Sequence, residues 1–141
     1  MDKNGPIIII EDDKDDREIL GEIFRKLEYK NEVCFFSDGQ EALNFLLDQK
    51  GSPFLILSDI NMPKLNGLEL REIILRNEDL RMKSIPFLFF TTATTKKSVL
   101  DAYALAVQGF FIKPTSFREL EQTIRKIIEY WSNCQSPGDF L

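Results

Sequence analysis

Five short runs of apolar residues, rich in β-branched and aromatic side chains, recur along the chain. The first, Ile7–Ile10, is an unbroken run of isoleucine. Such a run is typical of a strand that is buried on both faces of a parallel sheet. Leucine and phenylalanine dominate the later runs. The five predicted strands cover residues 7–10, 32–37, 54–58, 86–91 and 110–112.

Between these runs, apolar residues return every three or four positions, which predicts amphipathic helices. The helix over residues 96–107 has only a thin apolar face, made by Val99, Leu100, Tyr103 and Ala106. We therefore expect it to be weakly anchored and mobile. Residues 76–85 read as a long connection. The five predicted helices cover residues 13–27, 38–47, 68–74, 96–107 and 116–131.

Strands and helices alternate along the whole chain, which indicates βαβ units. The predicted fold class is therefore α/β, a doubly wound five-stranded parallel sheet with five helices on its two faces. The 141 residues suit one domain. We expect that domain to span residues 1–131, followed by a disordered C-terminal tail over residues 132–141.

Composition removes several classes of function. The chain contains no histidine, which excludes Ser-His triads and histidine-ligated metals. Cys34 and Cys134 form no CxxC pair. A net charge of −5 is unfavourable for direct nucleic-acid binding. No apolar run approaches the length of a signal peptide core or a membrane span. We expect a cytoplasmic protein without direct contact to membrane or nucleic acid.

Polar side chains follow the predicted strands at the edge where such sheets carry their chemistry. Taken singly, each has an ordinary explanation: acids cap a helix, an aspartate forms a turn, and a lysine is solvated on the surface. Together they would place three carboxylates, a hydroxyl and an ammonium side by side. The residues at the strand ends are Glu11, Asp12 and Asp13, then Asp59, Thr91 and Lys113.

Three neighbouring carboxylates repel one another unless a cation joins them. Oxygen ligands of this kind suit Mg²⁺, which commonly takes one or two carboxylates and also accepts a phosphate oxygen. A lysine and a threonine would add donors for phosphoryl oxygens. The residue types alone therefore predict a metal-dependent phosphate site.

Four motifs resemble those of the response-regulator receiver domain of two-component signalling, in particular its single-domain, chemotaxis-regulator-like members. They are IIIIEDD (7–13), SDINMPKLNG (58–67), FFT (89–91) and FFIKP (110–114). The similarity spans about residues 6–131, and the segment 76–85 resembles regulators paired with phytochrome-type sensor kinases. The resemblance implies a flavodoxin-like fold with strand order 2-1-3-4-5.

The resemblance also implies a phosphoacceptor signalling role. Asp59 would accept a phosphoryl group from a phosphohistidine of a sensor histidine kinase or a histidine phosphotransfer protein. Mg²⁺ (or Mn²⁺) would be bound by Asp12, by Asp59 and by the backbone carbonyl of Asn61. Glu11 would act mainly through a metal-bound water. The protein would not be an enzyme beyond its own phosphorylation and dephosphorylation.

Three further residues take implied roles in switching. Lys113 would pair with Asp59 at rest and with a phosphoryl oxygen afterwards, oriented by a cis Lys113–Pro114 peptide bond. The Thr91 hydroxyl would turn toward the phosphoryl group, and Phe110 would fill the space it leaves. The alternative for Phe110 is an ordinary core residue.

The implied output surface is formed by residues 96–107, 110–112 and 116–131. It would contact a downstream protein target, either as a monomer or as a phosphorylation-dependent homodimer. Ala93, two residues beyond Thr91, cannot position an attacking water. We therefore expect a phosphoryl group that outlasts that of a relative with a polar residue at this position.

Three other functions remain open at this stage. A haloacid-dehalogenase-type phosphatase also uses an aspartate at a strand end, but it requires a second acid where this chain has Asn61. A non-phosphorylated pseudo-receiver could serve as a binding scaffold, which the intact set of polar residues argues against. An FMN-binding flavodoxin would need a phosphate loop in place of the acids that follow Ile10.

Overall fold

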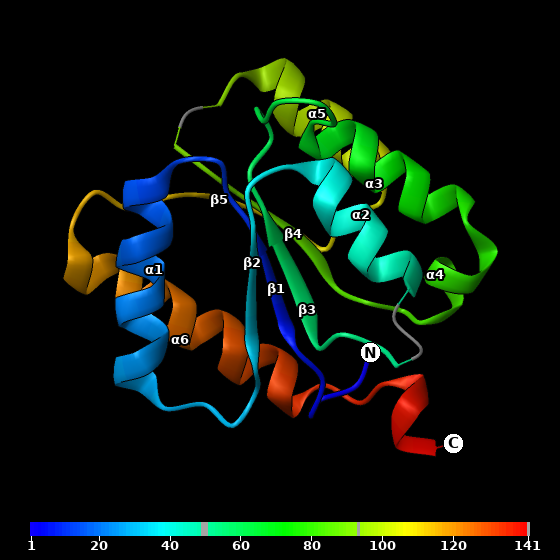
Figure 1. Cartoon of the computed structure of the whole chain (residues 1–141), viewed down its shortest axis with the longest axis horizontal. Helices are drawn as coiled ribbons and strands as arrows, with labels where there is room; N and C mark the ends of the chain where they lie inside the picture. Colours follow the sequence, from blue (N-terminus) through cyan, green and yellow to red (C-terminus); the bar gives the residue numbers. More distant parts are fainter. Residues whose placement is uncertain (49–50, 93, 141) are drawn as a thin grey trace.

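The computed structural model describes residues 1–48, 51–92 and 94–140, and the fold is built around one sheet. All five strands are parallel and lie in the order β2-β1-β3-β4-β5, which confirms the predicted fold class and strand order (Figure 1). The strands are β1 (Ile7–Ile10), β2 (Val33–Phe36), β3 (Leu55–Ser58), β4 (Phe87–Thr91) and β5 (Gly109–Ile112).

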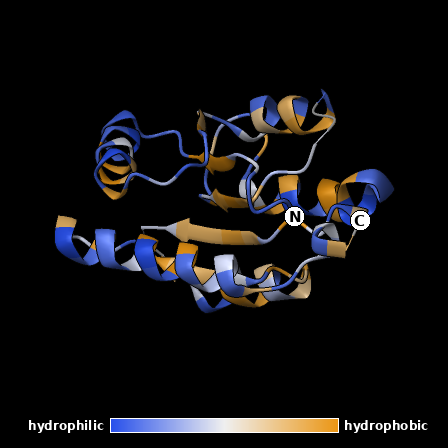
Figure 2. Cartoon of the chain, turned by 90° about the horizontal axis from the view of Figure 1, so that it is seen from below, coloured by the Kyte–Doolittle hydropathy of each residue, from blue (hydrophilic) through white to orange (hydrophobic). Residues whose placement is uncertain are grey.

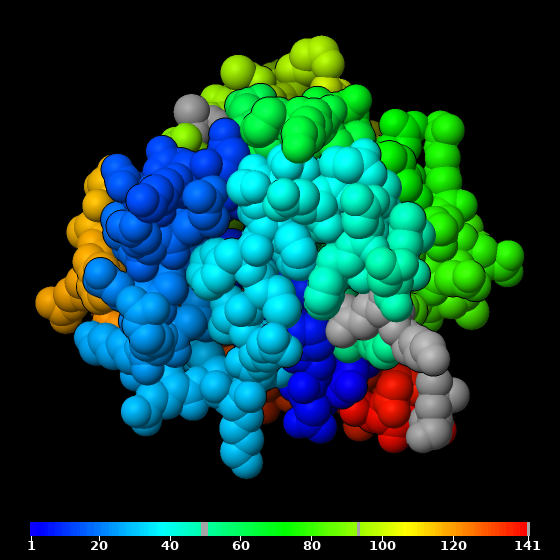
Figure 3. Space-filling model, in the orientation of Figure 1, coloured from blue at the N-terminus to red at the C-terminus, as the bar shows by residue number. Residues whose placement is uncertain are grey.

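Helices cover both faces of the sheet. One face is covered by α1 (Lys14–Leu27) and α6 (Phe117–Asn133). The other is covered by α2 (Gly39–Asp48), α3 (Gly67–Arg76), α4 (Glu78–Met82) and α5 (Lys96–Ala104). The strands are hydrophobic and lie between helices whose outer faces are hydrophilic (Figure 2). Strand β2 forms one edge of the sheet, between α1 and α2 (Figure 3).

The isoleucine run explains why the sheet has two covered faces. Successive residues of a strand point to opposite sides, so Ile7 and Ile9 pack on the side of α1 and α6, whereas Ile8 and Ile10 pack on the side of α2 and α3. All four are at most 2% exposed. Burial of each stabilises the fold by roughly 1.5–3 kcal/mol.

Helix caps follow the polar residues that precede each helix. The Asp13 carboxylate accepts a hydrogen bond from the Asp16 N–H and begins α1. Asn66 and Glu69 form a reciprocal capping box at α3. Ser116 caps α6, as its sequence position predicts. Capping therefore accounts for Asp13 among the acids that follow β1.

The predicted number of helices was too low, because residues 76–85 contain a helix. Asn77 caps α4 by accepting a hydrogen bond from the Leu80 N–H at 3.0 Å. Leu80 is buried, but the other residues of this short helix are exposed. With a single buried apolar residue, this short helix has no periodicity that would reveal it in the sequence.

The predicted inner face of the helix over 96–107 was wrong. Helix α5 ends at Ala104, and the residue that it buries completely is Ala102. Leu100 and Tyr103 are 60% and 52% exposed. Two large apolar side chains therefore lie on the surface of α5.

The C-terminal end of α5 is tied to α3 by Arg71. Its Nε donates to the Leu105 carbonyl at 2.9 Å and its Nη2 to the Ala106 carbonyl at 2.8 Å. The guanidinium lies over the Phe87 ring at 5.5 Å, and burial lowers the pKa of Arg71. The Gln108 side chain also donates to the Ala106 carbonyl. Ala106 itself has a φ of 56°.

Residues 136–140 pack beside the first residues of the chain, within the segment over 132–141 that we expected to be disordered. Pro137–Phe140 forms a 3₁₀ helix. The Ser136 hydroxyl donates to the Met1 carbonyl at 3.1 Å, and Lys3 pairs with Asp139 at 3.5 Å. Figure 1 shows this 3₁₀ helix near the N-terminus, at the end of the sheet where the strands begin. In the described ranges, no helix has the length and apolar character needed to cross a membrane.

Candidate functional site: an acidic cluster at the carboxyl ends of the strands

Strand register brings the first acids together. Ile10 of β1 pairs with Ser58 of β3, so Glu11 and Asp59 are the next residues on adjacent strands. The Asp59 N–H donates to the Ile10 carbonyl at 2.9 Å, which continues the pairing beyond the ends of the strands. The side chains of Glu11 and Asp59 therefore lie next to each other at the carboxyl ends of β1 and β3.

Three carboxylates form one cluster at this edge. Oxygen atoms of Glu11, Asp12 and Asp59 all lie within 4.8 Å of one another. Glu11 is 2% exposed and Asp59 is 9% exposed, whereas Asp12 is open to solvent. A hard divalent cation fits this donor set, because it takes carboxylate oxygens and would offset the mutual repulsion of the three acids.

Lys113 points into the cluster. Its backbone N–H donates to the Thr91 carbonyl at 2.7 Å, which places it just beyond β5 and beside β4. Its ammonium bonds directly to Glu11 Oε2 and lies 3.8 Å from Asp59 Oδ2. The side chain is 7% exposed. The inward direction that we expected is therefore present, but the tightest partner is Glu11.

Burial and the ion pairs shift the pKa values of this pair. Burial raises the pKa of Glu11 to about 7, against the opposing effect of the Lys113 hydrogen bond. For Lys113, burial alone would lower the pKa. The Glu11 hydrogen bond and the charges of Glu11, Asp59 and Asp16 outweigh burial and raise it. Burial therefore outweighs the ion pair for Glu11, whereas the ion pairs outweigh burial for Lys113.

The carboxylate of Asp59 has two distinct oxygen atoms. Oδ1 accepts a hydrogen bond from the Ile60 N–H at 2.7 Å, and Oδ2 faces Lys113. The loop that follows returns to the same place, because the Gly67 N–H donates to the Ile60 carbonyl at 2.8 Å. A Cβ on Gly67 would overlap the Asp59 carbonyl oxygen and lie 2.7 Å from the Phe89 ring. The glycine is therefore required for this loop to close on the site.

Thr91, Phe110 and Asn61 lie on β4, on β5 and in the loop after β3. Thr91 ends β4, pairs with Ile112 and is 2% exposed. Phe110 is half-buried, with its ring 6.0 Å from that of Phe89. Asn61 is exposed in the loop after β3. The switching roles of Thr91 and Phe110 and the carbonyl ligand of Asn61 stay predictions. Ala93 lies outside the described residues.

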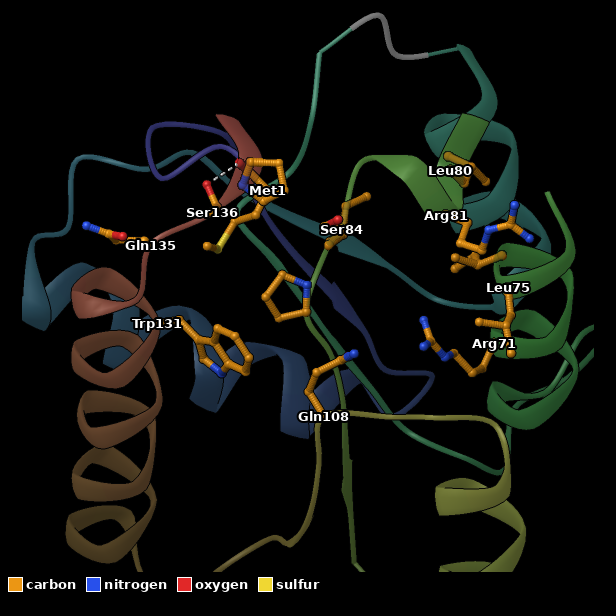
Figure 4. Close-up of a pocket in the computed structure, with 14 residues that line it drawn as sticks. Met1, Arg71, Leu75, Leu80, Arg81, Ser84, Gln108, Trp131, Gln135 and Ser136 are labelled. Carbon is orange, nitrogen blue, oxygen red and sulfur yellow. Dashed lines mark hydrogen bonds between the residues drawn. The ribbon is translucent and has the colours of Figure 1, made fainter. Parts of the chain in front are cut away.

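A separate cavity of about 360 Å³ opens at the other end of the strands (Figure 4). Trp131, Gln108 and Arg71 line it, together with Met1 from the start of the chain. It contains none of the residues of the acidic cluster. The acids that the sequence predicts for phosphate chemistry therefore lie in the open cluster and not in this cavity.

Comparison with known proteins decides the family. A family model described as response regulator receiver domain matches residues 7–125. The chain belongs to this family. Receiver domains are signalling proteins that receive phosphoryl groups from histidine kinases and act on downstream targets. The family binds Mg²⁺ or Mn²⁺ at an acidic pocket, and the cluster of Glu11, Asp12 and Asp59 fits that property.

Relatives of this receiver domain match it over nearly their whole length. It is 32% identical over 137 residues to the probable methanogenesis regulatory protein FilR2 of Methanothrix harundinacea, covering 94% of this chain and 87% of that protein. It is 30% identical over 138 residues to response regulator Rcp1 of Synechocystis sp., covering 92% of each.

Two solved structures have the same fold. The phosphorylated cyanobacterial phytochrome response regulator RcpA gives a TM-score of 0.83 at 27% identity, covering 93% of this chain and 96% of that chain. The Mn²⁺-bound form of Rcp1 gives a TM-score of 0.79 at 29% identity, covering 92% of this chain and 96% of that chain.

Two details of the receiver site differ from expectation. The described residues contain no cis peptide bond, so the Lys113–Pro114 bond is trans, the isomer that X–Pro bonds generally favour. Strand β5 already carries Lys113 to the acids in this form. Sequence reasoning also missed Asp16, whose Oδ2 lies 3.3 Å from Lys113 Nζ. Its only sequence signal was its place one helical turn after Asp12 and Asp13.

Proposed function

We propose that this receiver domain accepts a phosphoryl group on Asp59 from the phosphohistidine of a sensor histidine kinase or a histidine phosphotransfer protein. The observation that carries the proposal is the position of Lys113, whose ammonium lies within 4 Å of both Glu11 and Asp59 in a three-carboxylate cluster. The chain has no histidine, so the donor imidazole comes from the partner. We also propose that the protein is located in the cytoplasm.

Asp59 and Lys113 have distinct roles in the transfer. A carboxylate oxygen of Asp59 attacks phosphorus, the new O–P bond forms, and the P–N bond to the donor imidazole breaks with its electrons staying on nitrogen. The Ile60 N–H holds Oδ1 of Asp59, which leaves Oδ2 on the side of Lys113. The ammonium of Lys113 then pairs with a phosphoryl oxygen.

A divalent cation would be held by Asp12 and Asp59, with Glu11 beside it and the Asn61 carbonyl as a further ligand. Mg²⁺ or Mn²⁺ bound there would neutralise the acids and the incoming phosphoryl oxygens. Two properties support this assignment: the short oxygen separations of the cluster and the Mn²⁺-bound form of the relative Rcp1.

The response is passed to a surface made by α5, β5 and α6. Phosphorylation draws the Thr91 hydroxyl toward the phosphoryl group, and the Phe110 ring moves into the space released. The apolar side chains exposed on these elements support this surface as the docking site for a downstream protein or for a second copy of the chain. They are Leu100, Tyr103, Ile112 and Phe117, which are 41–60% exposed.

The proposal is tested by phosphorylating the protein in vitro. The chain is incubated with Mg²⁺ and a small phosphodonor, and intact mass spectrometry measures the number of phosphoryl groups added. We expect one group, absent in Asp59→Asn and present in the control Asp79→Asn, which removes an exposed acid of α4. Multiple turnover of phosphomonoesters would show a phosphatase instead. A protein that neither binds Mg²⁺ nor gains mass would be a scaffold.

A further inference from the structure

Asp16 is an acid next to the cluster but outside it. It lies in the first turn of α1, and its backbone N–H is held by the Asp13 cap at 3.0 Å. Its Oδ2 lies 3.3 Å from Lys113 Nζ, and its side chain is 32% exposed. It is absent from the three carboxylates whose oxygens converge. Asp16 therefore contacts the lysine of the site without sharing the cation-binding position.

The same two acids would serve both the lysine and the cation. Glu11 and Asp59 belong to the carboxylate cluster, and both lie within 4 Å of Lys113 Nζ. A divalent cation entering the cluster competes with the ammonium for these oxygens and also repels it. Lys113 must then weaken its bond to Glu11 while staying close enough to Asp59 to meet a phosphoryl oxygen.

We propose that Asp16 is a positioning residue that holds the ammonium of Lys113 when a divalent cation occupies the acidic cluster. It supplies a carboxylate that the cation does not use, on a helix whose first turn is fixed by its own cap. The proposal rests on the proposed function, because it assigns a role within the same site.

Loss of this carboxylate leaves Lys113 with Glu11 and Asp59 alone. The ammonium then competes more strongly with the cation, so divalent affinity falls. We expect Asp16→Asn to weaken Mn²⁺ binding about fivefold, the size of effect that one partly exposed ion pair provides. Asp16→Glu keeps the charge on a side chain that is one methylene longer and should bind Mn²⁺ close to the wild-type affinity.

Asp15 provides a matched control. It is the preceding residue of α1 and is exposed, and the structure gives Lys113 no ion pair with it in the part of the chain described. Asp15→Asn removes the same charge from the neighbouring position of the helix. Its effect on Mn²⁺ affinity measures the loss of general negative charge near the site.

The test is a double-mutant cycle with Mn²⁺ as the probe, read by electron paramagnetic resonance titration of the full chain. Asp16→Asn and Asp15→Asn are each measured in the wild-type protein and in Lys113→Met. In the wild-type protein we expect Asp16→Asn to lower the Mn²⁺ affinity more than Asp15→Asn does. In the Lys113→Met protein we expect the two substitutions to change the Mn²⁺ affinity equally. Thermal unfolding of every variant checks that each one folds.

Two outcomes would overturn the proposal. If Asp16→Asn and Asp15→Asn lower the Mn²⁺ affinity of the wild-type protein equally, Asp16 contributes only through its negative charge near the site and not through Lys113. A specific loss that persists in Lys113→Met would make Asp16 act on the cation without the lysine. Neither result depends on phosphorylation, so failure of Asp59 to accept a phosphoryl group is recognised separately by mass spectrometry.

Discussion

The raised pKa of Glu11 makes the stability of the metal-free protein depend on pH. The Glu11 side chain is 2% exposed, and its pKa is about 7 in the folded protein against a reference value of 4.5. Between these values the folded state binds a proton that the unfolded state has released. The contribution of Glu11 to stability is therefore fully present below about pH 4.5 and is lost as the pH rises through about 7.

The magnitude follows from the size of the shift. Each unit of pKa difference corresponds to about 1.4 kcal/mol, so a shift of about 2.5 units sets an upper value of about 3 kcal/mol. Water reaches the cluster on the open side of Asp12, and screening there reduces the value to roughly 1–2 kcal/mol. Glu11→Gln removes the proton equilibrium altogether. We therefore expect Glu11→Gln to lose this amount of pH dependence relative to the wild-type protein.

The assay is urea unfolding at several pH values between 5 and about 8, with a chelator present to remove divalent cations. The quantity compared is the free energy of unfolding of wild type minus that of the variant. Glu22→Gln, at an exposed position of α1, is the control and should follow the wild-type curve. The reasoning is refuted if Glu11→Gln and wild type lose or gain stability in parallel over this range.

Three other substitutions test different parts of the structure. Gly67→Ala forces a Cβ against the Asp59 carbonyl and the Phe89 ring, so calorimetry should show a loss of about 2–3 kcal/mol; an unchanged melting temperature would contradict this packing. Arg71→Ala removes the side-chain donor to the Leu105 carbonyl and one of the two side-chain donors to the Ala106 carbonyl and should cost about 1–3 kcal/mol, with faster hydrogen exchange at the end of α5 as its signature. Ile124→Ala, at a fully buried position of α6, should cost about 3 kcal/mol while Mn²⁺ affinity stays constant; a parallel loss of affinity would disprove the independence of core and site.

The strands and the acidic cluster could both be predicted from the sequence because both depend on local sequence patterns. A run such as Ile7–Ile10 admits little other than a strand covered on both faces, and in a parallel sheet the residues that follow each strand meet at one edge. Glu11 and Asp59 are adjacent in space because Ile10 pairs with Ser58. Local patterns therefore determined both the sheet and the three carboxylates.

The parts that were missed depend on contacts that no local pattern encodes. The face of α5 was assigned from large apolar residues, but Ala102 is the side chain that fits against the sheet, and Leu100 and Tyr103 lie outside. Asp16 meets Lys113 across 97 positions of the chain. Only the folded chain, in which the start of α1 and the end of β5 lie at the same edge of the sheet, brings these two side chains together.

The tie between Arg71 and the end of α5 restricts how that helix can move. While both carbonyl bonds hold, α5 cannot slide along the sheet, and any displacement is a pivot about its C-terminal end. Nine residues give a lever of about 13 Å, so a tilt of about 10° carries the Lys96 end through about 2 Å. In such a pivot the travel is greatest at the end of α5 that follows Thr91 and smallest at the end that leads into β5.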